Sequence, residues 1–106
     1  ADDAGNVWVG RERDLITMAH AARQTLVTVE RLYPGNLFDD PALAAGTLSS
    51  FYVTAVAPAA EGCKPLGFTG HYGEDEDALR AYAKASRGNA EFATYLAAYA
   101  TAPAAV

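Results

Sequence analysis

The sequence predicts an α/β fold with a mostly parallel sheet and flanking helices. The run from Thr25 to Glu30 is apolar and β-branched through Val29, which is typical of a buried central strand of a parallel sheet. The segment before it has helical spacing. Four apolar residues of that segment share one face: Leu15, Met18, Ala19 and Ala22. With the β-prone residues 7–9, the chain therefore predicts strand, helix and strand, joined as a right-handed parallel crossover.

The elements after this unit follow from turn and cap chemistry. Asp40 and Pro41 predict the N-cap and first position of a short helix that Gly46 ends. Residues 51–56 are aromatic and β-branched and predict a third strand, ended by Pro58. Asp14 is expected to cap the first helix. A long glycine-rich loop over residues 61–73 is of a length that is often functional in compact domains.

Two helices are expected after the loop. Acidic residues 74–77 begin the first one, where the helix dipole favours negative charge. Gly88 and Asn89 cap the junction between the helices, and Pro103 ends the second. Their expected buried stripes are Ala78, Leu79, Tyr82 and Ala83 in the first helix, and Phe92, Tyr95, Leu96 and Tyr99 in the second.

Composition restricts the class of protein. The chain has 106 residues and a net charge of −5, so it is long enough for one domain and is unlike a nucleic-acid-binding protein, which needs a basic face. No apolar run approaches the roughly 20 residues that cross a membrane, and residues 1–10 do not resemble a signal peptide. We therefore expect a cytoplasmic protein that binds neither nucleic acid nor membrane. The single cysteine, Cys63, allows no internal disulfide.

The first residues suggest that residues 1–106 form one segment of a larger α/β subunit. The chain begins at Ala1 without an initiator methionine, and strand-like residues follow within a few positions. This favours a fragment over a processed chain. Three strands would also cover the central strand only in part. A larger sheet, completed by missing sequence or by a partner subunit, is therefore expected.

Three residues are candidate ligand-binding groups. Glu30 ends the central strand, at the edge where open α/β sheets bind ligands. The alternatives are a solvated strand end or an ion pair with Arg31 or Arg23. Asn6 follows Gly5 in a turn and either lies near a site or serves the turn alone. His71 lies in the glycine-rich loop.

No catalytic or metal-binding set is predicted. Neither His71 nor His20 can be paired with a serine or cysteine nucleophile by spacing, and two histidines with one cysteine make no zinc pattern. The sequence has no phosphate-binding glycine motif. The acidic run 74–77 is more typical of a solvated first helical turn than of a metal site.

Motifs in order along the chain resemble a known family. They are Ala1-Asp2-x-x-Gly5-Asn6-Val7, Asp14-x-x-x-Met18-Ala19-x-Ala21-Ala22, Val27-Thr28-Val29-Glu30, Phe51-Tyr52-Val53-x-Ala55-Val56, Pro58, Gly62, Pro65, Tyr72, Leu79 and Tyr82. Over most of the chain, to about residue 99, this order resembles the C-terminal part of the A (alpha) subunit of family I CoA-transferases, of the glutaconate and 3-oxoacid type.

The resemblance implies a function that the residues alone do not give. In that family an A subunit pairs with a B (beta) subunit, and the hetero-oligomer moves CoA between carboxylic acids through a glutamyl-CoA thioester. The catalytic glutamate belongs to the B subunit, so no catalytic residue is expected here. Acyl-CoA and a carboxylic acid are substrates, and no cofactor or metal is implied. The segment alone would be inactive, and Glu30, Asn6 and His71 would bind substrate or CoA.

The chain departs from the family pattern at two points. Ser49 and Ser50 stand where the family commonly has a proline, and Gly62-Cys63-Lys64-Pro65 stands where it often has Gly-Ala-His-Pro. Two alternatives stay open. One is a CoA-ester hydrolase subunit of the same family, and the other is a small, non-catalytic α/β interaction module.

Overall fold

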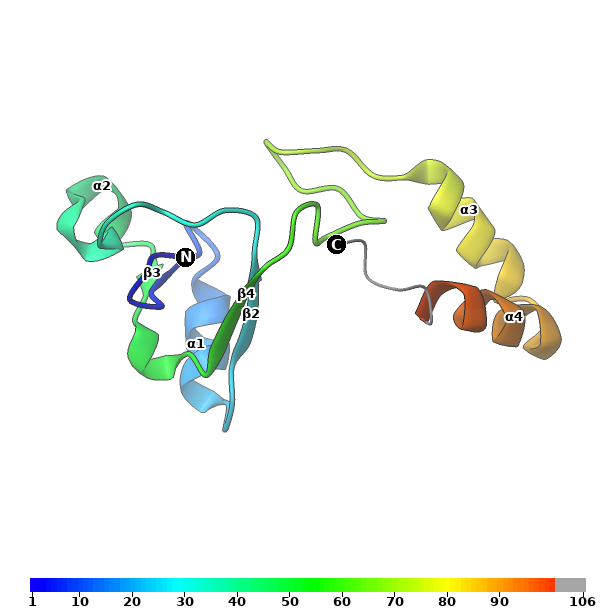
Figure 1. Cartoon of the computed structure of the whole chain (residues 1–106), viewed down its shortest axis with the longest axis horizontal. Coiled ribbons are helices and arrows are strands. Elements are labelled where there is room, and N and C mark those ends of the chain that lie inside the picture. Colours follow the sequence, from blue (N-terminus) through cyan, green and yellow to red (C-terminus); the bar gives the residue numbers. More distant parts are fainter. Residues whose placement is uncertain (101–106) are drawn as a thin grey trace. The chain divides into compact units, whose positions relative to one another are not determined.

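The computed structural model describes residues 1–100 and divides the chain into two compact units (Figure 1). The N-terminal unit spans Ala1–Gly62, and the C-terminal unit begins at Cys63. The assignment of residues 1–106 to a single segment of a larger subunit stays a prediction, as does the larger sheet.

The N-terminal unit is mixed α/β and contains short elements. In chain order they are β1 (Val7–Trp8), α1 (Arg13–Ala21), β2 (Leu26–Val29), the 3₁₀ turn η1 (Leu37–Asp39), α2 (Pro41–Ala44), β3 (Thr47–Leu48), the 3₁₀ turn η2 (Ser50–Tyr52) and β4 (Ala55–Pro58). The expected short helix at Asp40-Pro41 is confirmed, because Pro41 begins α2 and the Asp40 carboxylate accepts the Ala42 N–H at 2.9 Å.

The strands form two separate two-stranded sheets instead of one three-stranded sheet. β2 pairs with β4 in parallel, from Leu26 opposite Ala55 to Val29 opposite Pro58. The expectation that this strand takes part in a parallel sheet is confirmed. The expectation that residues 7–9 lie parallel to it is wrong, because β1 pairs antiparallel with β3. Val9 and Gly10 both donate their N–H to the Gly46 carbonyl, at 2.8 and 3.2 Å, which holds β1 against β3.

The third strand begins later than the aromatic run predicts. Residues 50–52 form η2, because the Ser49 hydroxyl accepts the Phe51 N–H at 3.2 Å and Ser50 accepts the Val53 N–H. Phe51 is 85% exposed, so it does not belong to a buried strand. β4 starts at Ala55 and ends at Pro58, which is the end that the sequence predicts.

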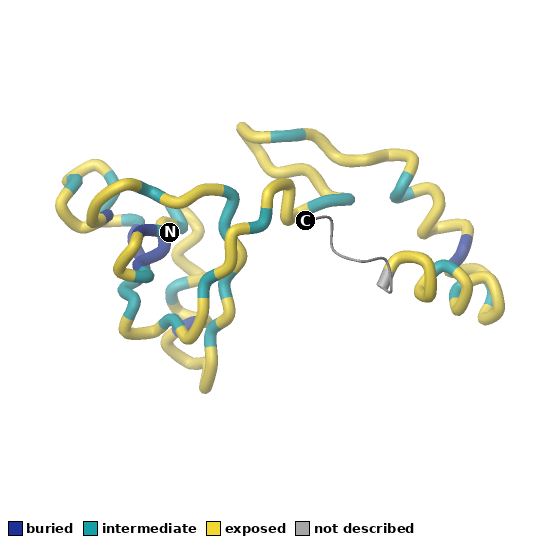
Figure 2. Tube along the Cα trace, viewed as in Figure 1, coloured by how far each residue is buried: buried dark blue, intermediate teal, exposed yellow. Residues whose placement is uncertain are grey.

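A small core lies between α1 and the two sheets. Val7, Ala19 and Leu48 are buried, and Ile16, Val27, Val29, Val53 and Val56 pack around them. Figure 2 shows how few positions in this unit are buried. The prediction of β2 as a buried central strand is wrong: Val27 and Val29 are half-buried, whereas Leu26 is 74% exposed. A strand with one neighbour and a helix on one face alternates between core and solvent.

Helix α1 begins at Arg13, one residue before the expected cap, Asp14. The residues that it turns toward the core also differ from the predicted stripe. Glu12 is its N-cap and makes no side-chain cap bond, whereas Asp14 lies within the first turn, where its charge still favours the helix. Ala19 is buried, but Met18 of the predicted stripe is 64% exposed. The stripe is therefore wrong in part, because the inward face includes Ile16 instead.

The C-terminal unit contains a loop followed by two helices, α3 (Glu76–Ala85) and α4 (Asn89–Ala100). The two expected buried stripes are confirmed only in part. The half-buried members are Ala78, Leu79, Phe92 and Tyr95. Tyr82 and Tyr99 are 48% and 60% exposed. Asn89 is the first residue of α4 and not its cap, since Gly88 accepts the Phe92 N–H. The expected stop at Pro103 lies outside the described residues.

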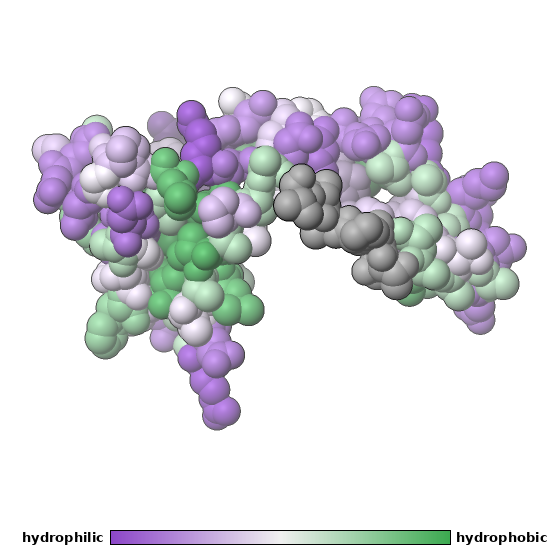
Figure 3. Space-filling model, in the orientation of Figure 1, coloured by the Kyte–Doolittle hydropathy of each residue, from purple (hydrophilic) through white to green (hydrophobic). Residues whose placement is uncertain are grey.

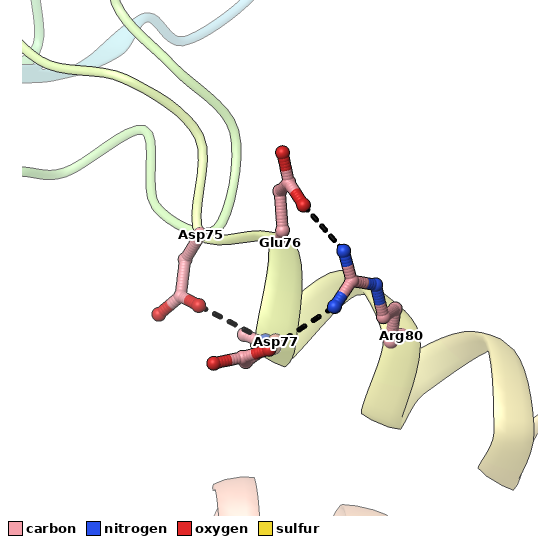
Figure 4. Close-up of polar contacts among 5 residues, drawn as sticks. Asp75, Glu76, Asp77 and Arg80 are labelled. Carbon is pink, nitrogen blue, oxygen red and sulfur yellow. Dashed lines mark hydrogen bonds and ion pairs between the residues drawn. The ribbon is translucent and has the colours of Figure 1, made fainter.

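The start of α3 provides a test of local capping (Figure 4). The Asp75 carboxylate accepts the Ala78 N–H at 3.0 Å, whereas Arg80 pairs with Glu76 and Asp77 on the exposed surface. We expect Asp75→Ala to lower the stability of the C-terminal unit by about 1 kcal/mol. Arg80→Ala, the control, should cost less than about 0.5 kcal/mol, because exposed ion pairs contribute little. Helical circular dichroism during thermal unfolding measures both changes, and equal losses would contradict the cap.

Candidate functional site

The N-terminal loop contains a buried polar cluster around Asp2 and Asn6. Both side chains are about 95% buried, at 4% and 5% exposure. The Asn6 Nδ2 donates to Asp2 Oδ2 at 2.9 Å, and the Asn6 Oδ1 accepts the Ser50 N–H at 2.9 Å. Asn6 therefore joins the first turn to η2. Both atoms of its amide are used within the fold, which agrees with the turn-stabilising interpretation.

Asp2 is the residue that sequence reasoning undervalued. Its carboxylate accepts the Ala4 and Asn6 N–H groups at 3.0 and 2.9 Å, and also the Leu37 N–H at 2.9 Å. The bonds within the turn are usual for an aspartate, whose carboxylate readily accepts N–H groups of nearby residues. The bond to Leu37 joins residues that are 35 positions apart, and no pattern in the neighbouring sequence predicts it. We call Asp2, Asn6, Leu37 and Ser50 the Asp2 cluster.

Gly5 completes this turn. Its φ is +84°, a conformation that residues with a Cβ rarely adopt. Its N–H donates to the Asp2 carbonyl at 3.1 Å. The spacing Asp-x-x-Gly-Asn therefore has a physical basis. In one turn, Asp2 accepts backbone N–H groups, Gly5 adopts the left-handed conformation, and the Asn6 amide bonds the Asp2 carboxylate.

The environment of Asp2 lowers its pKa. Burial alone would raise the pKa, but the hydrogen bonds from Leu37, Asn6 and Ala4 outweigh it and hold the pKa below the ordinary value. Asp2 therefore binds fewer protons in the folded chain than in the unfolded chain at acidic pH.

This difference predicts the pH dependence of stability. A lowered folded-state pKa contributes stability above the unfolded value of about 3.9, and the contribution is lost as pH falls through the folded pKa. We expect the free energy of unfolding to decrease below about pH 4, and to decrease less steeply in Asp2→Asn. Urea unfolding from pH 2 to 7, followed by fluorescence of the single tryptophan, Trp8, measures this. Identical slopes in both proteins would contradict the assignment.

Glu30 lies immediately after β2, at the carboxyl end of the parallel pair, as expected. Its Oε2 accepts the Glu61 N–H at 2.8 Å. Glu61 has φ +53°, which is unusual for a residue with a side chain. The Glu30 carboxylate therefore holds a strained turn that follows β4, at the edge where open sheets bind ligands.

His71 belongs to the C-terminal unit. It is exposed, and its ring stacks on Phe68 with centroids 4.5 Å apart and an interplanar angle of 13°. The loop around it is held by the Tyr72 hydroxyl, which accepts the Cys63 N–H at 2.8 Å, and by Lys64, which donates to the Gly73 carbonyl at 2.9 Å. His71 is thus presented on an ordered loop. The ligand-binding roles of Glu30, Asn6 and His71 stay predictions.

A depression of about 490 Å³ opens beside the Asp2 cluster. Asp2, Gly5 and Ser50 line one part of it, and Val53, Thr54 and Pro58 line another. Backbone and hydroxyl groups lie there next to apolar side chains, a mixture that suits a ligand with both kinds of surface. Neither Glu30 nor Asn6 lines this depression. Sequence reasoning did not find it, because its walls come from residues far apart in the chain.

The described residues carry no metal-binding group of three or more histidine, cysteine, aspartate or glutamate side chains. Within the same part of the chain, no helix has the length and apolar character needed to cross a membrane. Comparison with protein-family models, with curated proteins and with solved structures finds no match to this chain.

Proposed function

We propose that this chain is part of the A subunit of a CoA-transferase, and that it supports transfer of CoA between carboxylic acids on an enzyme completed by a B subunit. The observation that supports this proposal is the first motif of the resemblance, Asp2-x-x-Gly5-Asn6. Its residues hold a carboxylate with four N–H donors, a left-handed glycine and a bridging amide. The family resemblance has the same residue types at this spacing, and here each of the three has a role in one turn.

In this proposal the chain positions substrate and the partner subunit performs the covalent step. A glutamate carboxylate of the B subunit would attack the acyl carbonyl carbon and displace the CoA thiolate, which forms a glutamyl-acyl anhydride. The thiolate then attacks the glutamyl carbonyl carbon of this anhydride, so that the glutamyl thioester forms and the acyl group leaves as a carboxylate with one oxygen of the glutamate. The CoA sulfur then passes to the acceptor acid, which restores the glutamate. Glu30, at the carboxyl end of β2, would orient substrate or the turn that contacts it.

The test uses the complete gene product that contains this segment, together with a B-type subunit. We expect incubation with acyl-CoA to give a hydroxylamine-sensitive thioester, and addition of a free carboxylic acid to give a new acyl-CoA. The Glu30→Gln variant should lower transfer while the subunits stay associated, and Glu74→Gln, an exposed carboxylate elsewhere, is the control. A complex that binds acyl-CoA but forms no thioester would contradict transferase chemistry.

The same experiment separates the hydrolase alternative. A CoA-ester hydrolase would release free CoA thiol without an acceptor acid, whereas a transferase needs one. Measuring thiol release with and without the acid distinguishes these two activities.

A second candidate is a non-catalytic interaction module. It is favoured by the small core of the N-terminal unit and by the exposure of Leu26 and Phe51, at 74% and 85%. Large contiguous exposed apolar patches are typical of surfaces that bind another protein. An isolated, stable chain that binds a protein partner and never affects acyl-CoA turnover would favour this candidate.

A further inference from the structure

The outer edge of β2 has unused backbone groups. Ala55 and Ala59 donate their N–H groups to the carbonyls of Thr25 and Val29, at 3.3 and 2.8 Å. In a parallel pair every second residue bonds to the neighbour. The backbone N–H and C=O of Leu26 and Thr28 therefore point away from β4. Within residues 1–100, β2 has no other strand beside it.

The two edges of this sheet differ. On β4 the outward residues are Val56 and Pro58 by the same alternation, and Pro58 has no N–H to donate. On β2 neither a proline nor a charged residue interrupts residues 25–29. Protein edges are normally protected by proline, charge or a bulge. The β2 edge lacks this protection, so it is the edge that can accept another strand.

One large apolar side chain is exposed at this edge. Leu26 is 74% exposed, and Thr28 beside it is also exposed. Apolar side chains gather on the surface of the N-terminal unit around β2 and β4 (Figure 3). A parallel sheet is normally covered on both faces. An added strand with apolar side chains would bury Leu26 as well as satisfy the edge.

Charge at the two ends of the edge indicates the character of the strand. Arg23 precedes β2, and Glu30 and then Arg31 follow it. Both arginines are exposed, whereas the Glu30 carboxylate accepts the Glu61 N–H. A strand with carboxylates at both ends would match these two cations. A second copy of this chain fits less well, because the antiparallel register that pairs Leu26 with Thr28 places Arg23 opposite Arg31. Each copy also has a net charge of −5.

We infer that the free edge of β2 binds an extended, apolar strand of a partner protein that carries acidic residues at both ends. The strand adds to the sheet by backbone hydrogen bonds to Leu26 and Thr28. This inference does not depend on the proposed CoA chemistry.

The probe is a synthetic peptide of sequence Asp-Val-Thr-Val-Thr-Val-Asp, N-methylated on alternate residues so that one edge is blocked and the peptide cannot self-assemble. Its binding to the whole chain is followed by fluorescence anisotropy. Hydrogen exchange should show new protection at the amides of Leu26 and Thr28. A peptide methylated on every residue should not bind. Lysine in place of both terminal aspartates should weaken binding roughly ten-fold.

Variants of the chain locate the edge. Thr28→Pro removes an outward N–H of β2 and should weaken peptide binding roughly ten-fold or more. Val56→Pro removes the corresponding N–H of β4 and also a side chain that packs on the core. It is the control once circular dichroism shows that it folds, with binding retained. Because proline can disturb a strand, a second pair of variants changes only the charge of the chain. Arg23→Gln with Arg31→Gln should weaken binding several-fold, whereas Arg11→Gln with Arg13→Gln should not.

Three results would overturn the inference. The first is equal binding of the acidic and lysine peptides. The second is loss of binding in Val56→Pro with retention in Thr28→Pro. The third is self-association of the chain that Thr28→Pro abolishes, measured by light scattering at several concentrations, because a second copy would then be the occupant.

Discussion

Replacing Asp2 with alanine is expected to lower the free energy of unfolding of the N-terminal unit by roughly 3–5 kcal/mol. The substitution removes the acceptor of four N–H groups, from Ala4, Asn6 (two) and Leu37, at 2.9–3.0 Å. The donors of Asn6 and Leu37 would stay buried without a partner, and each unsatisfied donor carries a desolvation cost. The effect is large because one side chain holds together two separate segments of backbone, its own turn and the segment at Leu37.

Chemical unfolding followed by Trp8 fluorescence measures this loss. Asp3→Ala is the matched control, since Asp3 is the exposed neighbour, and it should change stability by less than about 0.5 kcal/mol. Asn6→Ala and the double variant complete a cycle, in which the two losses should be less than additive because the residues share a hydrogen bond. A loss below about 1 kcal/mol in Asp2→Ala would contradict the central role of the carboxylate.

Leu48→Ala is expected to cost about 2–5 kcal/mol, because it leaves a cavity beside Val7 and Ala19. Leu48 is 3% exposed, whereas Leu26 is 74% exposed. Leu26→Ala is therefore the control, with an expected change below about 0.5 kcal/mol.

The order of these two losses tests the fold directly. Thermal and urea unfolding of both variants, at equal protein concentration, gives the comparison. A larger loss at Leu26 than at Leu48 would contradict the core described here and would mean that β2 is buried in solution.

Features fixed by neighbouring residues were predictable. The cap at Asp40 and the turn around Asp2 depend on side chains that bond backbone two to four residues away. The parallel strand at residues 26–29 was predictable as a strand, because β-branched composition is local. Its exposure was not, since burial depends on how many strands and helices surround it.

Features that depend on distant residues were missed. The pairing of β1 with β3 depends on close approach of Gly10 to Gly46, where a Cβ on Gly46 would lie 2.9 Å from the Gly10 carbonyl oxygen. The aromatic residues 51–52 suggested a strand, but the Ser49 cap turns them into η2. The candidate site was predictable only in part for the same reason. Glu30 and Asn6 were identified by their positions in the sequence. The bonds that they accept from Glu61 and Ser50 were not, because these bonds join segments far apart in the chain.

The Asp2 cluster also has a consequence for the order of folding during synthesis. Its bonds join Asp2 to Leu37 and Asn6 to Ser50, across 35 and 44 residues. Closing such loops costs chain entropy before any contact repays it. The first turn therefore cannot reach its final environment until the ribosome has released the chain beyond Ser50. Until Leu37 has emerged, the Asp2 carboxylate has only its local partners, and the N-terminal unit acquires the stability of these long-range bonds late.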